Sequence, residues 1–307
     1  MTPRQLAMFL GVSAIWGASY LQIKIALDGF DASMVVFGRV ALAAAILYLA
    51  VRALEDGERA FAFVRRHPDR IAVLGFLTVA LPFMLISYGE TEISSALTGI
   101  LVAPGPLFVA LFAPFLDPTE KVDRRGAIGL LVGFAGVILL LGVDAVHDLG
   151  EFLGALAVIG AACSYGLGAM YAKSKLAGAG VPPLVMSLFA CVAASLMVLP
   201  VAAATLPGTS ADLGEIAAVV SLGVIGTALA FVLYYSLISE MGAGRASLVG
   251  YMIPPTAVAY GALLLDETVT AVSIAGLVLI LGGVALAGRE RAAEVEEGAP
   301  PPPPEPA

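Results

Sequence analysis

The chain has 307 residues, of which 60% are hydrophobic and 13% are charged, and its formal net charge is −8. A soluble domain carries about 25% charged residues, so this composition excludes an ordinary water-facing globule. The mean hydropathy of +0.97 indicates a protein whose surface faces lipid. Much of the excess acid lies in segment 288–307, so the charge does not indicate a nucleic-acid partner. Cys163 and Cys191 lie inside apolar runs without the spacing of a disulfide framework or metal site, and we expect no metal and no cofactor.

An apolar segment of about 20 residues crosses the hydrocarbon core of a bilayer as a helix. The chain contains ten such segments, in two sets of five. The first set is Gln5–Leu27, Ala32–Leu54, Arg70–Gly89, Ile93–Phe115 and Gly126–Val143. The second set is Phe152–Tyr171, Pro183–Ala203, Leu213–Ser236, Ala243–Leu265 and Ala271–Gly288. We therefore predict an all-α integral membrane protein with ten transmembrane helices.

Two segments outside these spans have a distinct composition. The longest connection, 55–69, contains "GERAFAFVRRHPD", and its mixture of aromatic and basic residues predicts a short amphipathic piece on the membrane surface. The segment 289–307 is acidic and proline-rich, cannot bury a core, and is predicted to be disordered. The predicted organisation is a first repeat over 5–143, a second repeat over 152–288 and a tail over 289–307.

The basic residues indicate how the chain is oriented. Lys and Arg of short loops stay on the cytoplasmic side of a membrane. With the N-terminus inside, the inner segments hold Arg4, Arg52, Arg59, Arg65, Arg66, Arg70, Lys121, Arg124, Arg125, Lys173, Lys175, Arg245, Arg289 and Arg291. The outer loops then hold acids and no basic residue. This separation predicts a multi-pass protein of the plasma (cytoplasmic) membrane, with both termini in the cytoplasm.

The two sets of spans resemble each other in sequence. "AIWGASYLQIK" begins at Ala14 and "CSYGLGAMYAK" begins at Cys163, so each has an aromatic–Gly pair followed by Lys at the same offset. Later, "EKVDRRGAIGLLVGFAGV" from Glu120 matches "ETVTAVSIAGLVLILGGV" from Glu267. Because five is an odd number, the second copy must enter the membrane upside down. Inverted repeats of this kind underlie many secondary transporters, whose substrate site lies near the midplane between the halves.

The chain resembles the drug/metabolite transporter superfamily, and specifically its EamA-domain family. The residues that carry the resemblance are "WGASY" from Trp16, "GRVALAAAIL" with Arg39, the mid-span Pro104 and Pro254, and the two Glu…Gly…Gly blocks. The resemblance covers the chain from about Leu6 to Ala287. It implies transport of small metabolites, often the efflux of amino acids or related compounds, without fixing the substrate. The chain departs from an exact duplicate because no Arg in the seventh span matches Arg39, and because Pro106 has no counterpart.

The first span has a partly polar face near the membrane midplane. Ser13, Trp16, Tyr20 and Lys24 follow spacings of three, four and four residues, which place them on one side of a helix. Such a face at that depth points into protein or water rather than lipid. We predict that Ser13, Trp16 and Tyr20 line a substrate cavity, with Tyr165 as the inverted counterpart of Trp16. The alternative is plain helix packing through the aromatic ring and its neighbouring glycine.

Two prolines lie near the middle of the fourth and ninth spans. Each proline removes a backbone hydrogen bond, and in a membrane the freed carbonyl needs a partner in a cavity or on a neighbouring helix. We predict Pro104 and Pro254 as helix-break or gating positions. Residues before them extend the predicted substrate site: Thr98 before Pro104, and Ser247 and Tyr251 before Pro254. A kink that serves only packing is the alternative.

Charged residues at the spans allow more than one interpretation. Arg39 lies below the outer end of its span, where burial is costly unless it is paired or hydrated. It is either a structural clamp, bound to Glu90, Glu92 or carbonyl oxygens, or a substrate contact. Lys24 is predicted to interact with the dipole of its own helix end and to extend to the membrane interface. Glu120 and Glu267 are predicted to cap the starts of the fifth and tenth spans, with ion coupling as the alternative. Tyr88, Tyr234 and Tyr235 near span ends are typical of the interfacial aromatic belt.

These features predict a secondary transporter, and an exporter in particular, of small metabolites such as amino acids. Its partners would be a small-molecule substrate and the lipid bilayer, with the oligomeric state left open. A passive channel or facilitator is the alternative from the same features. An intramembrane enzyme is disfavoured because His67 and His147 lie in opposite loops and no paired aspartates or Ser/His pair occur within spans. Energy coupling stays open among facilitated diffusion, exchange, and coupling through Glu90 or Glu92.

Overall fold

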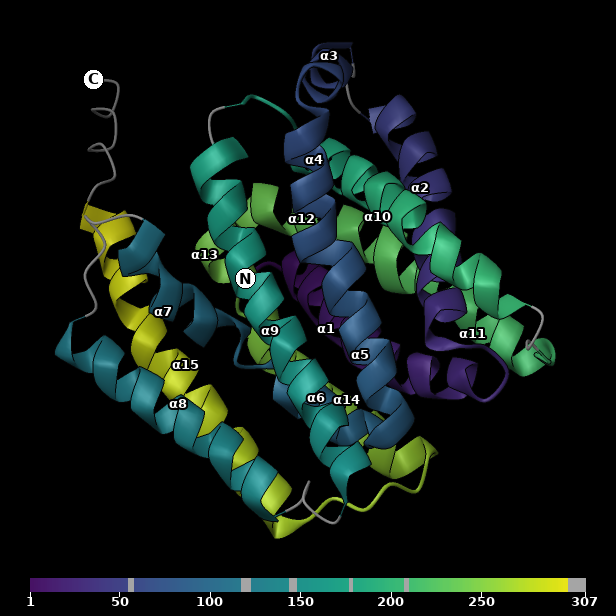
Figure 1. Ribbon diagram of the computed structural model, residues 1–307. Coiled ribbons are helices and arrows are strands. Elements are labelled where there is room, and N and C mark those ends of the chain that lie inside the picture. Colours follow the sequence, from purple (N-terminus) through teal and green to yellow (C-terminus); the bar gives the residue numbers. More distant parts are fainter. Residues whose placement is uncertain (55–57, 117–122, 144–147, 177–178, 207–209, 298–307) are drawn as a thin grey trace.

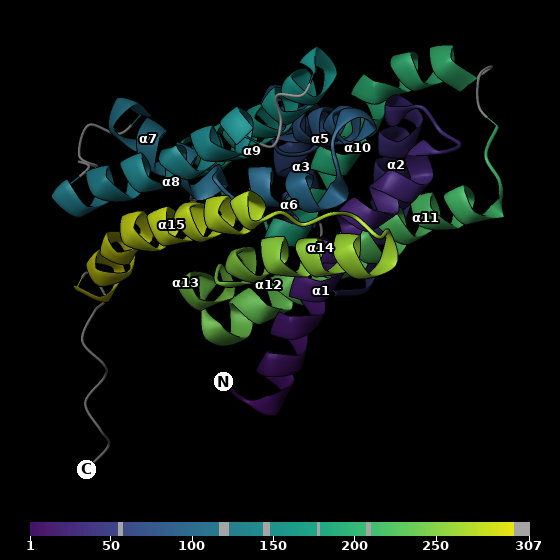
Figure 2. The ribbon, with the colours of Figure 1, turned by 90° about the horizontal axis from the view of Figure 1, so that it is seen from below.

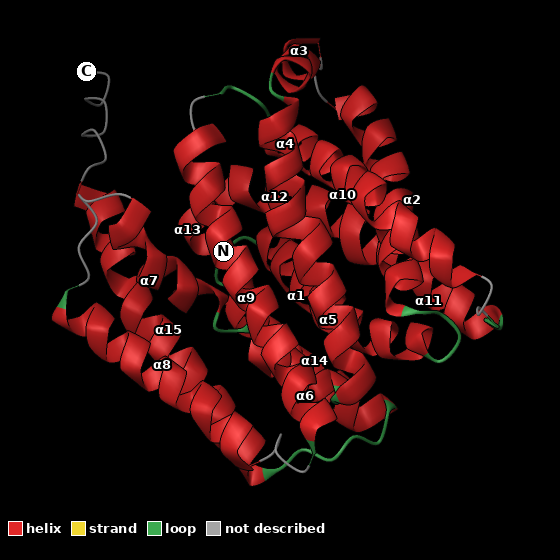
Figure 3. Ribbon diagram, in the orientation of Figure 1, coloured by secondary structure: helices red, strands yellow, loops and turns green. Residues whose placement is uncertain are grey.

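The computed structural model describes residues 1–54, 58–116, 123–143, 148–176, 179–206 and 210–297. Every regular element within these ranges is a helix, and none is a strand (Figure 3). Nine of the described segments are long and apolar enough to cross a membrane, and the apolar part of the last helix, Ala271–Ala287, is shorter. The described chain therefore confirms the predicted all-α membrane fold.

The helices follow the predicted order (Figure 1). The first half contains α1 (Pro3–Leu27), α2 (Ala32–Leu54), α3 (Glu58–Arg66), α4 (Pro68–Gly75), η1 (Phe76–Ala80), α5 (Leu81–Glu92), α6 (Ser95–Val102), α7 (Gly105–Leu116) and α8 (Arg124–Val143). The second half contains α9 (Leu149–Leu176), α10 (Pro183–Thr205), α11 (Leu213–Gly223), η3 (Val224–Leu229), α12 (Ala230–Met241), α13 (Ala243–Ala246), α14 (Val249–Leu264) and α15 (Ala271–Glu297). The third, fourth, eighth and ninth spans are each built from consecutive pieces, as α4–η1–α5, α6–α7, α11–η3–α12 and α13–α14.

Two predicted ends differ from the structure. The third span continues past Gly89 to Glu92, because the protein interior accepts the polar Glu90 that marked a boundary in the sequence. The last helix continues past Gly288 to Glu297, because the sequence "RERAAEVEE" consists of strong helix formers apart from Val295. Residues 298–307 of the predicted tail and Glu120, the predicted cap of the fifth span, lie outside the described residues.

The long connection after α2 contains the short helix α3. Val64 is buried, whereas Arg65 and Arg66 are exposed, so the helix has one apolar side and one basic side. Phe61 packs edge-on against Phe189 of α10, with ring centroids 5.3 Å apart. The connection is thus helical and amphipathic, and its place on the membrane surface stays a prediction.

The repeated aromatic–Gly pair has a packing explanation. A Cβ placed on Gly17 would collide with the Thr256 side chain of α14, and its next neighbour, Ala257 N, would lie at 3.1 Å. A Cβ placed on Gly166 would lie 2.7 Å from Phe108 Cβ of α7. Glycine is needed at both positions because α1 packs closely against α14 at Gly17, and α9 packs closely against α7 at Gly166.

The π-helical turns η1 and η3 hold equivalent places in the third and eighth spans. A π-turn leaves carbonyl groups without the usual i+4 partner. In η3, the Thr227 hydroxyl donates to Leu222 O at 2.9 Å, and beside η1 the Ser164 hydroxyl of α9 donates to Leu77 O at 2.8 Å. Side chains thus satisfy the interrupted backbone in both halves.

Helices α8 and α15 form a close pair at one side of the bundle (Figures 1 and 2). A Cβ placed on Gly283 would lie 2.6 Å from Gly129 O and 2.5 Å from Gly133 N. The glycines of the two repeated Glu…Gly…Gly blocks therefore allow the two backbones to touch. Packing of small residues is the usual basis of such helix association in lipid, where burial of apolar surface gives no preference.

The spans define two faces of the bundle. The N-terminal face holds the start of α1, where Arg4 pairs with Glu240 of α12 at 3.2 Å, and the end of α9, where Lys175 O accepts from Arg70 at 3.1 Å. The opposite face holds the ends of α1 and α5. There, Ser210 N donates to Gly29 O at 3.3 Å and so joins the two halves.

Two side chains at the opposite face bind helices other than those predicted. Lys24 Nζ donates to Glu90 O at 2.7 Å and Ile93 O at 3.0 Å, so it caps the C-terminus of α5 rather than its own helix. Glu267 accepts from the backbone N–H groups of Ser95 at 2.8 Å and Ala96 at 2.9 Å. It therefore caps α6 instead of the tenth span, because the connection after α14 carries it across to that helix start.

Candidate functional site

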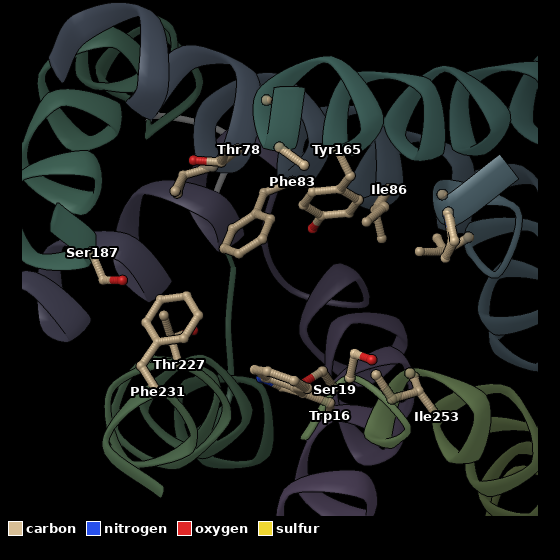
Figure 4. A pocket seen from close by; sticks show the side chains of 18 of the residues that line it. Trp16, Ser19, Thr78, Phe83, Ile86, Tyr165, Ser187, Thr227, Phe231 and Ile253 are labelled. Carbon is tan, nitrogen blue, oxygen red and sulfur yellow. The ribbon is translucent and has the colours of Figure 1, made fainter. Parts of the chain in front are cut away.

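A cavity of about 860 Å³ lies between the two halves (Figure 4). Helices from both repeats line it, including α1, α2, α5, α9, α12 and α14 together with the turns η1 and η3. Its lining continues to Leu176, Val181 and Pro183 at the N-terminal face. Towards the opposite face it ends at Ile23 and Ile86. The cavity therefore reaches one face of the bundle, and the contacts of Lys24, Glu267 and Ser210 close the other face.

Aromatic rings form two walls of this cavity. Trp16 lies on α1, and its ring centroid is 5.0 Å from that of Tyr234 and 6.3 Å from that of Phe231. Tyr165 of α9 lies beside Phe83 on the wall across from Trp16 (Figure 4). The structure thus brings Trp16 and its repeat counterpart Tyr165 into one cavity.

Arg39 is the one charged residue among the described residues that line the cavity. Its Nε donates to Thr227 Oγ1 at 2.9 Å, and its guanidinium carbon lies 4.0 Å from the centroid of the Phe83 ring. Within the described chain it forms no ion pair with Glu90 or Glu92, so the predicted clamp to these acids is wrong. Because Thr227 binds only Nε and Phe83 contacts only one face of the guanidinium, its other N–H groups are available to a bound solute.

The ninth span presents backbone as well as side chains to the cavity. Pro254 lacks the N–H that would bond to Gly250 O, and both residues line the cavity together with Tyr251 and Ser247. Contrary to the predicted break, α14 runs through Pro254 without interruption. The break in this span lies earlier, between α13 and α14, where the Ser247 hydroxyl donates to Gly244 O at 2.7 Å.

Three predicted site residues lie outside the lining. The Ser13 hydroxyl donates to Phe9 O at 2.8 Å, and the Thr98 hydroxyl donates to Ser94 O at 2.9 Å. Both side chains are buried in helix contacts. Pro104 is buried in the turn that separates α6 from α7, while its neighbours Ala103 and Gly105 line the cavity. On α1 the cavity face is formed by Trp16, Ser19, Tyr20 and Ile23, one turn further along than Ser13.

Several lining residues did not figure in the sequence prediction. Thr78 of η1 and Thr227 of η3 both face the cavity and are separated by the same offset as Trp16 and Tyr165, so the repeat alignment carried a signal for them. Tyr235 also lines the cavity, and its hydroxyl lies 2.7 Å from Ser187 Oγ. The prediction that Tyr235 belongs to the interfacial belt is therefore wrong.

The chain is similar to several curated transporters over most of its length. A protein described as "Probable terminal-alkyne amino-acid exporter" from Streptantibioticus cattleyicolor is 24% identical, over 89% of this chain and 90% of its own. "Uncharacterized transporter YoaV" from Bacillus subtilis is 23% identical, over 90% of this chain and 93% of its own. An "Uncharacterized transporter" from Archaeoglobus fulgidus is 26% identical, over 72% of this chain and 78% of its own.

One solved crystal structure has the same fold. It superimposes with a TM-score of 0.65 at 20% sequence identity, covering 92% of this chain and 96% of that chain. The model of the EamA-like transporter family matches the chain twice, over residues 4–142 and 152–289. The two matches together span nearly the whole sequence, and the chain belongs to the EamA-like transporter family.

Proposed function

We propose that this protein is a secondary transporter that exports small metabolites such as amino acids by alternating access between its two inverted repeats. The observation that carries the proposal is the cavity between the halves, which reaches the N-terminal face and is closed at the opposite face. Two related half-structures of opposite sense can exchange conformations, and the exchange would open the cavity to the other side.

The lining favours a small solute with both an apolar part and a carboxylate. Pockets for small molecules measure roughly 300–1,000 Å³ and are mainly apolar with a few polar groups, which fits the volume of about 860 Å³. Arg39 offers a cation that suits a carboxylate geometrically, and Trp16 and Tyr165 offer ring faces for an apolar or ammonium group. The relative that is described as an amino-acid exporter supports the same substrate class.

The orientation of the protein in the membrane and the direction of transport form part of the same proposal. The basic residues of the loops favour the N-terminal face as the cytoplasmic one, which would make the described state inward-open. In that state an exporter loads its cargo. The described residues that line the cavity include no His, Cys, Asp or Glu, which disfavours an intramembrane enzyme at this site.

Transport by purified protein in sealed vesicles tests the proposal. We expect saturable uptake of at least one labelled amino acid, accelerated by unlabelled amino acid on the far side. Arg39→Ala should lower this counterflow by about tenfold, the equivalent of about 1.4 kcal/mol for one lost polar contact. Arg65→Ala, which removes an exposed Arg of α3, is the matched control and should transport normally.

The results separate the alternatives. Uptake that does not saturate and shows no counterflow would indicate a passive facilitator instead of a carrier. Equal transport by the Arg39→Ala and Arg65→Ala variants would remove the carboxylate contact from the proposal. No transport across a broad amino-acid panel would contradict the substrate class.

A further inference from the structure

Glu90 is a buried carboxylic acid without a hydrogen-bond partner. Its exposed fraction is 0%, and neither Oε1 nor Oε2 accepts a hydrogen bond from any described residue. A buried carboxylate needs an ion pair or several hydrogen bonds, whereas the protonated acid is far less costly to bury. The surroundings of Glu90 therefore fit the neutral, protonated form.

Glu90 lies directly beyond the closed end of the cavity. Ile86, one turn earlier on the same side of α5, lines that end, and so does Ile23 of α1. The next residue on α1, Lys24, donates to the backbone carbonyls of Glu90 and Ile93. The carboxyl group is thus packed into the contact between α1 and α5 that separates the cavity from the opposite face.

The charged groups around Glu90 come from several elements. Lys24 of α1, Arg39 of α2 and Glu267 of the connection after α14 all act on it electrostatically, and Tyr20 of α1 is near it as well. On α9, which packs against α5, the charged residue nearest the opposite face is Glu151. Lys24 Nζ donates to the two backbone carbonyls, and neither Lys24 nor any other described residue donates to the Glu90 carboxyl oxygens.

We propose that Glu90 is a proton-binding site that controls the gate at the opposite face: protonated Glu90 holds this gate closed, and loss of the proton to water lets it open. The inference rests on the alternating-access function proposed above and adds its regulation. Opening would separate α1 from α5 and bring water to the carboxyl group. The ionised carboxylate would then be hydrated, and Lys24, released from the carbonyls, could pair with it.

The step conserves charge and atoms, because one carboxylate takes one proton from water at the opposite face and returns it there. A single proton changes an equilibrium by at most about tenfold per pH unit. In the closed state Glu90 is fully buried and does not itself line the cavity. Proton binding would therefore set how often the gate opens, and a more acidic medium at this face would keep it closed.

Thiol labelling from the outside measures gate opening without a known substrate. The reporter is Ile86→Cys, which lies at the closed end of the cavity, in a chain whose Cys163 and Cys191 are replaced by Ala. Intact cells are treated with a membrane-impermeant maleimide between pH 5 and pH 8. Each rate is divided by that of Ser210→Cys, an exposed residue at the opposite face, which corrects for thiol ionisation and establishes the orientation.

We expect the corrected labelling of Ile86→Cys to fall as the external pH is lowered. Adding Glu90→Gln, a neutral side chain of the same size, should make labelling slow at every pH. Adding Glu92→Gln, which changes an exposed acid on the same turn, should leave the pH dependence unchanged. Should Glu90→Gln fail to accumulate in membranes, Glu90→Leu serves as the neutral variant, and the parent profile still provides a test.

Three results would overturn the proposal: labelling of the parent that does not change with pH, labelling that is absent at every pH, or a Glu90→Gln variant with the pH dependence of the parent. None of them depends on a transported solute. Counterflow that persists alongside any of these results would reject the Glu90 gate while the transport function stands. The expected labelling without any counterflow would support the Glu90 gate and reject the proposed transport function.

Discussion

The carboxylate of Glu267 allows a quantitative prediction, because it joins two spans through three hydrogen bonds. It accepts from Ser95 N at 2.8 Å, from Ser95 Oγ at 3.0 Å and from Ala96 N at 2.9 Å. Ser95 is fully buried, so water cannot replace these bonds. Glu267→Gln keeps the shape of the side chain but removes the charge and turns one acceptor into a donor. A hydrogen bond to a charged group contributes about 1.5–3 kcal/mol, so we expect a loss of about 2–3 kcal/mol in the free energy of unfolding.

Thermal unfolding of purified protein in a mild detergent measures this loss. With roughly 2 °C of midpoint per kcal/mol in a large chain, Glu267→Gln should lower the unfolding midpoint by about 5 °C. Glu215→Gln is the matched control, because Glu215 makes a similar capping bond to Asp212 N at 2.7 Å in an exposed position. Water compensates for that bond, so its midpoint should change by about 1 °C or less. Equal shifts in the two variants would refute the argument that burial of the cap decides its contribution.

Three further predictions concern the cavity, the helix pair and the topology. Trp16→Ala should lower counterflow by about tenfold, because the solute loses contact with the ring, while the amount of protein in the membrane stays normal. Tyr48→Ala, on an exposed side of α2, should transport like the parent. Equal counterflow rates in the two variants would place Trp16 outside the solute path. Gly283→Leu should reduce the yield of folded protein, because a Cβ at this position meets the backbone of α8. Gly282→Leu is the control, because a Cβ there meets nothing within 4 Å. Similar yields of the two variants would contradict the close pairing of α8 and α15. Asp212→Cys should react with an impermeant thiol reagent in intact cells, and reaction only after permeabilisation would reverse the proposed orientation.

The membrane fold was predictable because each span carries its own signal. A run of about 20 apolar residues has to cross the bilayer whatever its neighbours are, and the repeat doubled the information at Trp16 and Tyr165. Composition alone misplaced the end of a span where contacts with neighbouring helices determine that end. Glu90 marked the end of a span in the sequence, but the packing of α5 against α1 and α9 buries it.

The partners of the charged side chains were not predictable in the same way. Arg39 donates to Thr227 of the other half, and Glu267 binds α6. Both contacts join segments that are far apart in the sequence, and helix periodicity contains no information about which spans become neighbours. The residue types showed that these charges needed partners, and the tertiary arrangement selected them.

The paired π-turns also fix the rotational phase of two spans. A π-turn holds about one residue more than an α-helical turn, and one residue corresponds to a rotation of about 100° in an α-helix. Deleting a residue from η1 would therefore turn α5 about its axis and point Phe83 and Ile86 away from the cavity that they line. The same holds for η3 and Phe231 in α12. Since the additional residue occurs at matching positions in both halves, the simplest history places its insertion before the duplication, so that one ancestral change set the direction of both helices.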